Sequence, residues 1–313
     1  MSKRDVLIMF PPRPKAMAQL EDQYILHRYD EAEDKMAFLA EVGPRCEAVV
    51  LNGHTDLTRA HLDHLPKVKI VACSSAGFEP IDDKALQERG IALSNSSAAL
   101  LDDVADAALM LTLAARRNLV DGHDYVRSGR WGREGMYPLM SSINGKRAGI
   151  VGFGNIGQAI ARRFEPLRLE IAYTARGPKD LPYRYEPDLT ALAEWSDILV
   201  VITPGGEETR GLISQEVIEA VGPKGTIINV ARGTVVDEKA LIAALKSGAL
   251  GSAGLDVYED EPNPDPDLTG LPNVTLYPHH ASGTVETRDA MAQTVVDNIA
   301  ACFDGRDLPN RVF

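Results

Sequence analysis

Ionisable residues accompany three apolar stretches in the last third of the chain. GTIINVARGT carries Arg232, AGLDVYEDEP carries Asp256 and Glu261, and NVTLYPHHASG carries His279 and His280. If these stretches are parallel strands of one sheet, their carboxyl ends meet at the edge where such sheets bind ligands. A cation, a carboxylate and an imidazole at that edge predict acid–base chemistry on an anionic substrate. Each residue alone also has a plain interpretation, as a helix cap, a loop charge or a structural histidine.

A glycine-rich turn precedes these residues. GIVGFGNIGQAIARR holds Gly152, Gly154 and Gly157 in a G-x-G-x-x-G pattern, with Asn155 and Ile156 between the last two glycines. The first glycine permits a tight turn, the second lets the backbone approach a pyrophosphate, and the third packs the helix on the strand. The helix N-terminus adds partial positive charge. Placed between an expected strand and an expected helix, the turn predicts a dinucleotide site rather than a purely structural turn.

The stretch IAYTARGPK, residues 171–179, bears on which dinucleotide binds. It ends about 20 residues beyond the glycines, where NAD sites carry an Asp or Glu for the ribose hydroxyls. Here Ala175 holds that place, next to Arg176 and near Lys179. A carboxylate would repel a 2′-phosphate, whereas a guanidinium binds one through charge-assisted hydrogen bonds. The stretch predicts NADP(H) in preference to NAD(H). The alternative is that both cations are ordinary solvated surface charges.

Short apolar runs alternate with helix-periodic stretches along the whole chain, which predicts an α/β fold. Five such runs lie in the first hundred residues, and a second series of six begins with RAGIVGF. We expect two Rossmann-like domains, the larger a doubly wound parallel sheet that binds the dinucleotide. Residues 1–98 and 284–313 would form the substrate-binding domain and 99–283 the NADP-binding domain, with a hinge between them. Residues 102–126 are predicted to form one buried helix and 284–303 one amphipathic helix.

The composition limits the class of partner. The chain has 33 Lys plus Arg against 45 Asp plus Glu, a net charge of −12, which argues against nucleic acid or an anionic membrane. No apolar run is long enough for a membrane span, and the start does not resemble a secretory signal. Cys46, Cys73 and Cys302 lack disulfide or metal spacing, so we expect a reduced, cytoplasmic protein. His61 and His64 have no third ligand nearby in the sequence, so we expect surface placement and no metal.

In combination, the motifs resemble those of the D-isomer-specific 2-hydroxyacid dehydrogenases. The resemblance covers nearly the whole chain: SSAGFEPID, DDVADAALMLTLAARR, GKRAGIVGFGNIGQAIARR, NVARGTVVDEKALIAALKSGALGSAGLDVYEDEP and PHHASGTVETR. The last motif, with no acid after the second strand, is most similar to the NADPH-preferring glyoxylate/hydroxypyruvate reductase branch. The resemblance implies reduction of a small 2-oxo acid to the 2-hydroxy acid, the D-isomer where the product is chiral, by a homodimer.

The resemblance also implies a role for individual residues. His279 is the general acid–base, Glu261 its carboxylate partner, and Arg232 binds the substrate carboxylate and polarises the carbonyl. This agrees with the chemistry, because hydride transfer to a 2-oxo acid leaves an alkoxide that needs a proton, and a neighbouring carboxylate favours protonated imidazole. The resemblance further implies that the backbone at Ala76 and Gly77 binds the substrate carboxylate. The implied cofactor-binding residues are Gly152, Gly154, Asn155, Ile156, Gly157, Ala175, Arg176, Lys179, Thr203, Val230, Asp256 and Ser282, with Asp256 accepting from the nicotinamide carboxamide.

The chain departs from the family pattern in two places. Ala76 stands where many relatives have valine, which predicts a slightly wider entrance to the substrate site. Residues 131–140, WGREGMYPLM, match poorly the segment that reaches the partner's active site in several relatives, so side-chain specificity stays open. His280 is the lesser histidine candidate, because the family varies at its position.

Other functions stay open. One is a broader 2-ketoacid reductase that acts on longer substrates. Formate dehydrogenase fits less well, because Glu261 stands where that branch carries an amide. A non-catalytic NADP-sensing protein, similar to corepressors of this fold, is the alternative outside enzymes. Such a protein need not retain Arg232, Glu261 and His279 together, and all three are present.

Overall fold

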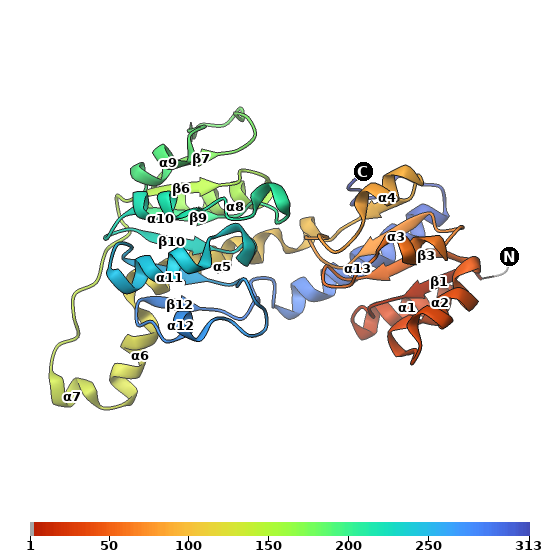
Figure 1. The fold of residues 1–313 in the computed structure, drawn as a ribbon, viewed down its shortest axis with the longest axis horizontal. Helices are drawn as coiled ribbons and strands as arrows, with labels where there is room; N and C mark the ends of the chain where they lie inside the picture. The colour runs from red at the N-terminus through yellow and green to blue at the C-terminus, as the bar shows by residue number, and fades with distance from the viewer. Residues whose placement is uncertain (1–2) are drawn as a thin grey trace. The chain divides into compact units, whose positions relative to one another are not determined.

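The computed structural model describes residues 3–313, which form two compact units (Figure 1). Unit 1 takes the chain up to Leu100 together with Gly283–Phe313, and unit 2 is Leu101–Ser282. Both are built on parallel sheets flanked by helices, which confirms the predicted α/β, Rossmann-like fold class. The assignment of substrate to one unit and cofactor to the other stays a prediction. No helix within residues 3–313 has the length and apolar character that crossing a membrane requires.

Unit 1 contains a five-stranded parallel sheet in the order β2-β1-β3-β4-β5. Its strands are β1 (Asp5–Ile8), β2 (Ile25–Arg28), β3 (Cys46–Leu51), β4 (Ile70–Cys73) and β5 (Ala92–Ser94). Its helices are α1 (Pro14–Gln23), α2 (Lys35–Val42), α3 (Arg59–Asp63), α4 (Asp83–Glu88) and α13 (Val285–Phe303), and short 3₁₀ turns lie at Tyr29–Glu31 and Gly43–Arg45.

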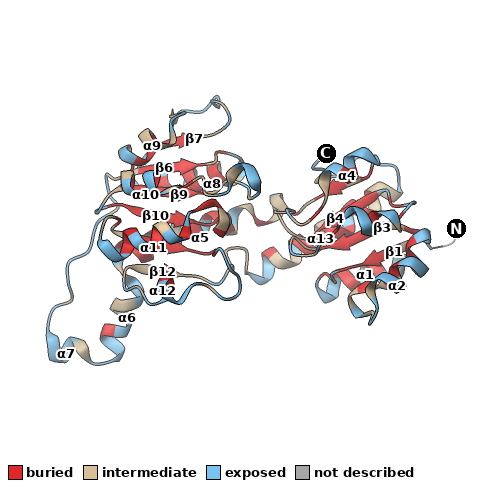
Figure 2. Ribbon diagram, in the orientation of Figure 1, coloured by how far each residue is buried: buried red, intermediate tan, exposed pale blue. Residues whose placement is uncertain are grey.

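Alternating side chains of the unit 1 strands build two separate cores, as the period of a strand requires. Val6 and Ile8 of β1 pack with α1 and α13 on one face of the sheet. Leu7 of the same strand packs on the other face with apolar residues of α2, α3 and α4. Figure 2 shows β1, β3 and β4 as largely buried. The helix predicted over 284–303 is α13, and its buried side chains pack on one face of the sheet.

Unit 2 contains a seven-stranded parallel sheet in the order β12-β11-β10-β9-β6-β7-β8. Its strands are β6 (Arg147–Val151), β7 (Glu170–Thr174), β8 (Arg184–Tyr185), β9 (Ile198–Val201), β10 (Thr226–Asn229), β11 (Ser252–Leu255) and β12 (Val274–Leu276). Its helices are α6 (Leu119–Arg127), α7 (Arg130–Glu134), α8 (Asn155–Phe164), α9 (Leu189–Trp195), α10 (Gln215–Val221), α11 (Glu238–Ser247) and α12 (Pro266–Thr269), with 3₁₀ turns at Glu165–Leu167, Glu207–Thr209 and Gly233–Val235.

The strand order of unit 2 reverses at β6. The chain goes from β6 to its neighbour β7 and later returns to β9 on the other side of β6, which makes a topological switch point. Apolar residues of α9, α10 and α11 cover one face of the sheet. On the other face, Gly254 of β11 leaves room for Leu111. Ligands of doubly wound sheets bind outside the carboxyl ends of the strands at such a switch point.

Two details of the predicted secondary structure are wrong. The single helix expected over 102–126 is two helices: α5 (Ser97–Arg117) begins before that range, and α6 follows after a break at Asn118. Asn118 has φ 45°, a left-handed conformation that asparagine tolerates better than most residues. The second sheet has a seventh strand, β8, which is only two residues long and gives no periodic signal.

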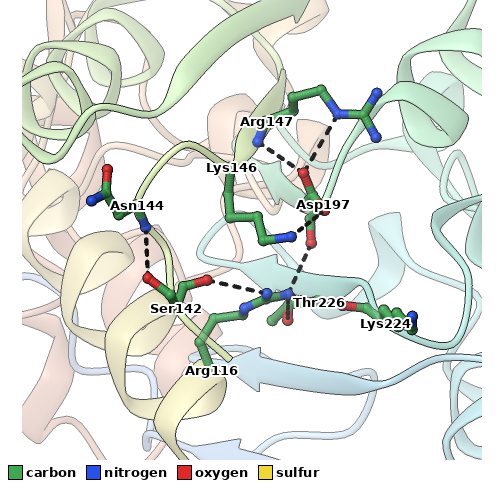
Figure 3. A network of polar contacts seen from close by, with 8 residues as sticks. All are labelled: Arg116, Ser142, Asn144, Lys146, Arg147, Asp197, Lys224 and Thr226. Atoms are coloured by element: carbon green, nitrogen blue, oxygen red, sulfur yellow. Dashed lines mark hydrogen bonds and ion pairs between the residues drawn. The ribbon is translucent and has the colours of Figure 1, made fainter. Parts of the chain in front are cut away.

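A polar network joins the amino ends of several unit 2 strands (Figure 3). The buried guanidinium of Arg116 donates to backbone oxygens of Asp197, Lys224 and Ser142 and to the hydroxyl of Thr226. Its Nε is also buried and has no hydrogen-bond partner within residues 3–313. Burial lowers the pKa of Arg116, and the charge of Asp197 opposes that effect. The network therefore ties three separate chain segments, at Ser142, Asp197 and Lys224–Thr226, to one side chain.

Asp197 forms the second half of this network (Figure 3). Its carboxylate accepts from Lys146 Nζ at 3.2 Å and from the Arg147 amide at 3.0 Å. Burial alone would raise the pKa of Asp197, but the Arg147 amide and the Lys146 ammonium outweigh that effect, and the pKa is lowered. The carboxylate is therefore stabilised as an anion at the start of β6 and β9.

Candidate active site

His279 and Glu261 form a close pair in unit 2. His279 Nδ1 lies 2.6 Å from Glu261 Oε2, and the two side chains are 32% and 28% exposed. The other carboxylate oxygen accepts from the Tyr258 amide at 3.0 Å, so one oxygen of Glu261 is held by backbone while the other faces the ring. The carboxylate is thus oriented and can stabilise a positive charge on the imidazole.

The backbone of His279 adopts an unusual conformation. Its φ is +48°, in the left-handed region where non-glycine residues are uncommon. The His279 amide donates to Asp256 O at 2.7 Å and lies 3.1 Å from Tyr277 O. The surrounding turn therefore enforces a conformation that costs free energy, as is common at functional sites.

Asp256 organises the same turn. It is buried at the end of β11, and its two carboxylate oxygens accept from the His280 amide at 2.7 Å and the Ala281 amide at 3.0 Å. Burial raises the pKa of Asp256, and the two amides partly oppose that effect. The role implied for Asp256, acceptance from a nicotinamide carboxamide, stays a prediction. Its part in shaping the turn after His279 was missed by the sequence analysis.

Tyr258 is a further residue that the sequence analysis missed. Its hydroxyl lies 2.8 Å from Tyr277 O and 3.3 Å from Leu255 O, and it accepts from the Tyr277 amide at 3.2 Å. Burial raises the pKa of Tyr258 to about 12, so this hydroxyl stays protonated and can donate. Since its amide also binds Glu261, Tyr258 supports the backbone two residues before His279 and the carboxylate that faces it. Tyr258 belongs to the motif AGLDVYEDEP, and this position beside Asp256 and Glu261 was the signal in the sequence that could have identified it.

Arg232 lies on the loop after β10, the strand next to β11, which in turn neighbours β12. The Asn229 side chain shapes this loop, because it accepts from the Ala231 amide and donates to Arg232 O, both at 3.0 Å. A Cβ at Gly233 would lie 1.9 Å from the Tyr258 carbonyl, so only glycine lets the loop approach the segment that leads to Glu261. The three predicted catalytic residues thus come from three neighbouring strand ends.

The glycine-rich turn follows β6 at the switch point. Gly152 has φ +98°, which favours glycine, and a Cβ at Gly157 would lie 2.2 Å from Gly152 O. Gly154 faces open space and precedes α8, whose first turn has no side-chain cap and no acidic residue. The buried Thr203 Oγ1 has no partner within residues 3–313. Uncapped amides, an open backbone and an unpartnered hydroxyl all fit a dinucleotide.

The remaining predicted cofactor residues also belong to unit 2. Asn155 and Ile156 form the first turn of α8, Val230 directly follows β10, and Ser282 closes the segment that contains His279. Ala175 follows β7, and the Gly152 amide donates to Thr174 O at 3.0 Å, so the end of β7 adjoins the turn.

Arg176 and Lys179 are exposed, and neither forms an ion pair within residues 3–313. Their charges thus lie beside the glycine-rich turn without an acidic neighbour bound to them. The NADP(H) preference expected from these two cations stays a prediction.

Ala76 and Gly77 lie in unit 1, on the loop after β4. Asn95 Nδ2 donates to Ala76 O at 2.9 Å, and the Gly77 carbonyl packs so closely on Gly53 that a Cβ at Gly53 would lie 2.3 Å from it. Within residues 3–313, neither the Ala76 nor the Gly77 amide donates a hydrogen bond inside this unit. The carbonyls of Ala76 and Gly77 are thus fixed by contacts within unit 1, and the two amides can bind an anion.

The two histidines at 61 and 64 have structural positions in unit 1. His61 and His64 are half-buried rather than on the open surface. The His61 ring lies edge-on to the buried Tyr29, and its Nδ1 contacts Thr58 in a capping box at the start of α3. Burial lowers the pKa of His61. His64 is the C-cap of the same helix. Within residues 3–313, no group of three or more His, Cys, Asp or Glu side chains is arranged to hold a metal ion.

Known proteins resemble this chain in sequence over most of its length. Residues 109–281 match the model of the D-isomer specific 2-hydroxyacid dehydrogenase NAD binding domain. The chain is 42% identical over 304 residues to a glyoxylate/hydroxypyruvate reductase of Arabidopsis thaliana, covering 97% of both chains. It is 37% identical over 308 residues to a 2-ketogluconate reductase of Gluconobacter oxydans, covering 98% of both.

A solved structure has the same architecture. It is the NADPH-dependent glyoxylate/hydroxypyruvate reductase of Sinorhizobium meliloti in complex with NADP and malonate. The TM-score is 0.90 at 36% identity, over 99% of this chain and 97% of that one. With matches of this extent and a dinucleotide turn and His–Glu pair in unit 2, the chain belongs to the family of D-isomer-specific 2-hydroxyacid dehydrogenases.

Proposed function

We propose that this enzyme uses NADPH to reduce a small 2-oxo acid, glyoxylate or hydroxypyruvate, to the 2-hydroxy acid, the D-isomer where the product is chiral. The observation that carries the proposal is the 2.6 Å contact between His279, after β12, and Glu261, after β11. Arg232 follows β10, the next strand of the same sheet. Relatives named as glyoxylate/hydroxypyruvate reductases support the substrate class.

In this proposal each residue acts on a defined part of the reaction. NADPH, when bound, supplies the hydride. Arg232 binds the substrate carboxylate with its planar guanidinium and polarises the 2-oxo group, and the amides of Ala76 and Gly77 bind the same carboxylate. His279 holds a proton on Nε2 and delivers it to the carbonyl oxygen as negative charge develops there. Glu261 stabilises the protonated ring before that transfer.

The cofactor preference rests on the end of β7. An acid for the ribose hydroxyls is absent at Ala175, and two exposed cations stand nearby, Arg176 and Lys179. A guanidinium at that place offers a 2′-phosphate charge-assisted hydrogen bonds worth about 1.5–3 kcal/mol each. We expect Arg176→Ala to lower kcat/KM for NADPH about ten- to a hundredfold and to change kcat/KM for NADH little. Equal losses with both cofactors would make Arg176 an ordinary surface charge.

We also propose that the enzyme is a homodimer built through unit 2. Apolar side chains are exposed along α5, α6, α7 and the segment after α7: Met110, Leu113, Leu119, Val120, Val126, Trp131, Met136, Leu139 and Met140. Trp131, Met136 and Leu139 are 61%, 86% and 93% exposed. In Figure 1, α6 and α7 extend away from the seven-stranded sheet. A monomer rarely leaves so much apolar surface in water. Light scattering on a sizing column should give twice the 34.0 kDa chain mass.

A spectrophotometric assay tests the activity. NADPH absorbance at 340 nm should fall when glyoxylate is added to the wild type and stay constant with His279→Ala. Binding of NADPH without turnover on any 2-oxo acid would favour the non-catalytic, NADP-sensing alternative. A panel of kcat/KM values for glyoxylate, hydroxypyruvate and 2-ketogluconate separates the proposed reductase from a broader 2-ketoacid reductase. A cytoplasmic location is part of the proposal, in keeping with cysteines at positions 46, 73 and 302 whose spacing in the sequence is not that of a disulfide framework.

A further inference from the structure

We propose that the hydroxyls of Tyr173 and Tyr185 hold the loop from Ala175 to Lys179 in the conformation that binds a 2′-phosphate. The two tyrosines are positioning residues, because they act through the loop rather than on the ligand. The inference rests on the NADPH preference proposed above and adds to it the part of the structure that maintains this preference.

Each end of the loop is bound to a tyrosine hydroxyl. At the first end, Tyr185 Oη donates to Ala175 O at 3.2 Å. At the other end, the Lys179 amide donates to Tyr173 Oη at 2.6 Å, and Lys179 O lies 3.5 Å from the same hydroxyl. Between these ends, neither the amide nor the carbonyl of Arg176 forms a hydrogen bond within residues 3–313. The path of the backbone around Arg176 therefore depends on the two hydroxyls.

The tyrosines are themselves fixed to the glycine-rich turn. The Tyr173 ring is fully buried and stacks on Phe153 with centroids 3.9 Å apart and planes inclined by 15°. Phe153 lies between the first two glycines of the turn. The Tyr185 ring, on the edge strand β8, lies 5.4 Å from Tyr173. The stack thus connects the expected pyrophosphate site to the loop that carries Arg176.

Fixing this loop in advance favours one ligand over another. The pyrophosphate and the 2′-phosphate belong to one molecule, so the turn and Arg176 must lie at a set separation when it binds. A loop that is already ordered loses less conformational entropy on binding than a mobile loop. Only a ligand with a 2′-phosphate uses Arg176, so loosening the loop should weaken that ligand and leave its unphosphorylated counterpart unchanged.

The experiment compares two small probes by isothermal titration calorimetry. Adenosine 2′,5′-bisphosphate carries the 2′-phosphate, and adenosine 5′-monophosphate lacks it. Tyr173→Phe and Tyr185→Phe each remove one hydroxyl and keep the ring. The matched control is Tyr183→Phe: the Tyr183 ring also packs on Phe153, at 5.5 Å, but its hydroxyl donates to Glu165 at 3.0 Å and does not touch the loop.

We expect Tyr173→Phe to weaken the bisphosphate about three- to tenfold, as the loss of one or two neutral hydrogen bonds implies. Tyr185→Phe should weaken it less, because its bond is longer. Both variants should bind the monophosphate within about twofold of the wild type, and Tyr183→Phe should match the wild type with both probes. The ratio of the two dissociation constants is the readout, since a general loss of structure would weaken both probes together.

The outcomes separate this inference from the proposed cofactor preference. If Arg176→Ala selectively weakens the bisphosphate while Tyr173→Phe and Tyr185→Phe behave like Tyr183→Phe, the role of the hydroxyls is refuted and the preference stands. Equal weakening of both probes in Tyr173→Phe also refutes it. If the wild type binds both probes equally well, the preference for a 2′-phosphate is itself wrong, and the inference falls with it.

Discussion

Nδ1 of His279 contacts Oε2 of Glu261 at 2.6 Å, although the backbone of His279 lies in the left-handed region. The ring is therefore oriented by a carboxylate on one side and by a turn that holds an unfavourable φ on the other. Such double control is needed only if the position of the ring matters for function.

The first prediction concerns the proton donor. Replacing His279 with Gln should lower kcat for glyoxylate reduction about 10²- to 10⁴-fold, because positioned proton transfer contributes that much. Affinity for NADPH, measured by quenching of protein fluorescence, should stay within about twofold. The matched control is His280→Ala, whose side chain is exposed and whose amide, not its ring, binds Asp256. If His280→Ala is inactive and His279→Gln keeps half of the wild-type kcat, the wrong histidine was chosen.

A second prediction uses pH to test Glu261. In the variant Glu261→Gln an amide faces Nδ1, and an amide does not stabilise a protonated imidazole as a carboxylate does. Reduction needs the protonated ring, so activity should be lost at lower pH than in the wild type. The measurement is kcat/KM for glyoxylate from pH 5 to pH 10 at saturating NADPH. Identical profiles for variant and wild type would refute the His–Glu pair as a functional unit.

Tyr258→Phe should separate positioning from folding. The variant keeps the ring and the amide that binds Glu261, and it loses the hydroxyl that bonds the backbone of Tyr277. We expect kcat to fall about three- to tenfold, because the turn before His279 is less firmly held. The shape of the pH profile and the affinity for NADPH should not change. A wild-type kcat in Tyr258→Phe would show that this hydroxyl is dispensable.

Two glycines of the dinucleotide turn should respond differently to alanine. Gly157→Ala places a Cβ 2.2 Å from Gly152 O, so it should destabilise unit 2 by about 1–3 kcal/mol and lower its melting temperature. Gly154→Ala meets no atom within 4 Å, so the melting temperature should be kept. Binding of NADPH should nevertheless weaken at least about tenfold in Gly154→Ala, because backbone must approach the pyrophosphate there. Tight binding by that variant would place the pyrophosphate elsewhere.

The last prediction concerns stability and pH at Asp197. Its lowered pKa means that the ionised carboxylate stabilises the fold above the unfolded value of about 3.9 and that this stabilisation is lost as the pH falls through the lowered value. Asp197→Asn should therefore cost about 1–2 kcal/mol at pH 7, and the difference from wild type should shrink toward pH 3. Thermal melts across this range provide the measurement. Glu194→Gln is the control, since Glu194 is exposed and forms no ion pair within residues 3–313. A difference that does not change with pH would contradict the prediction.

Local patterns were sufficient to predict the strands other than β8, and the edge of the sheet where Arg232, Glu261 and His279 lie. Val6, Leu7 and Ile8 alternate between two cores as a strand requires, and Arg232, Glu261 and His279 follow neighbouring strands as the sequence analysis expected. These features follow from spacing along the chain, which a sequence displays directly.

The residues that were missed depend on contacts between distant parts of the chain. Tyr258 bonds the backbone at Tyr277, 19 residues away, and Tyr185 bonds Ala175 from a strand too short to recognise. Asn118 breaks a helix through a backbone conformation that nothing in the neighbouring periodicity requires. A hydroxyl or amide of this kind has no signature until the fold brings its partner near.

The Arg116 network lies at the amino ends of the unit 2 strands, whereas the candidate catalytic residues lie at the carboxyl ends. Its four acceptors are three backbone carbonyls and one hydroxyl, and a backbone carbonyl survives every substitution of the residue that carries it. The Arg116 hydrogen bonds that hold the amino ends of the strands therefore depend little on which side chains occupy the carboxyl ends. Residues there can be exchanged during evolution, and new oxo acids accommodated, while the same strands stay anchored by one arginine.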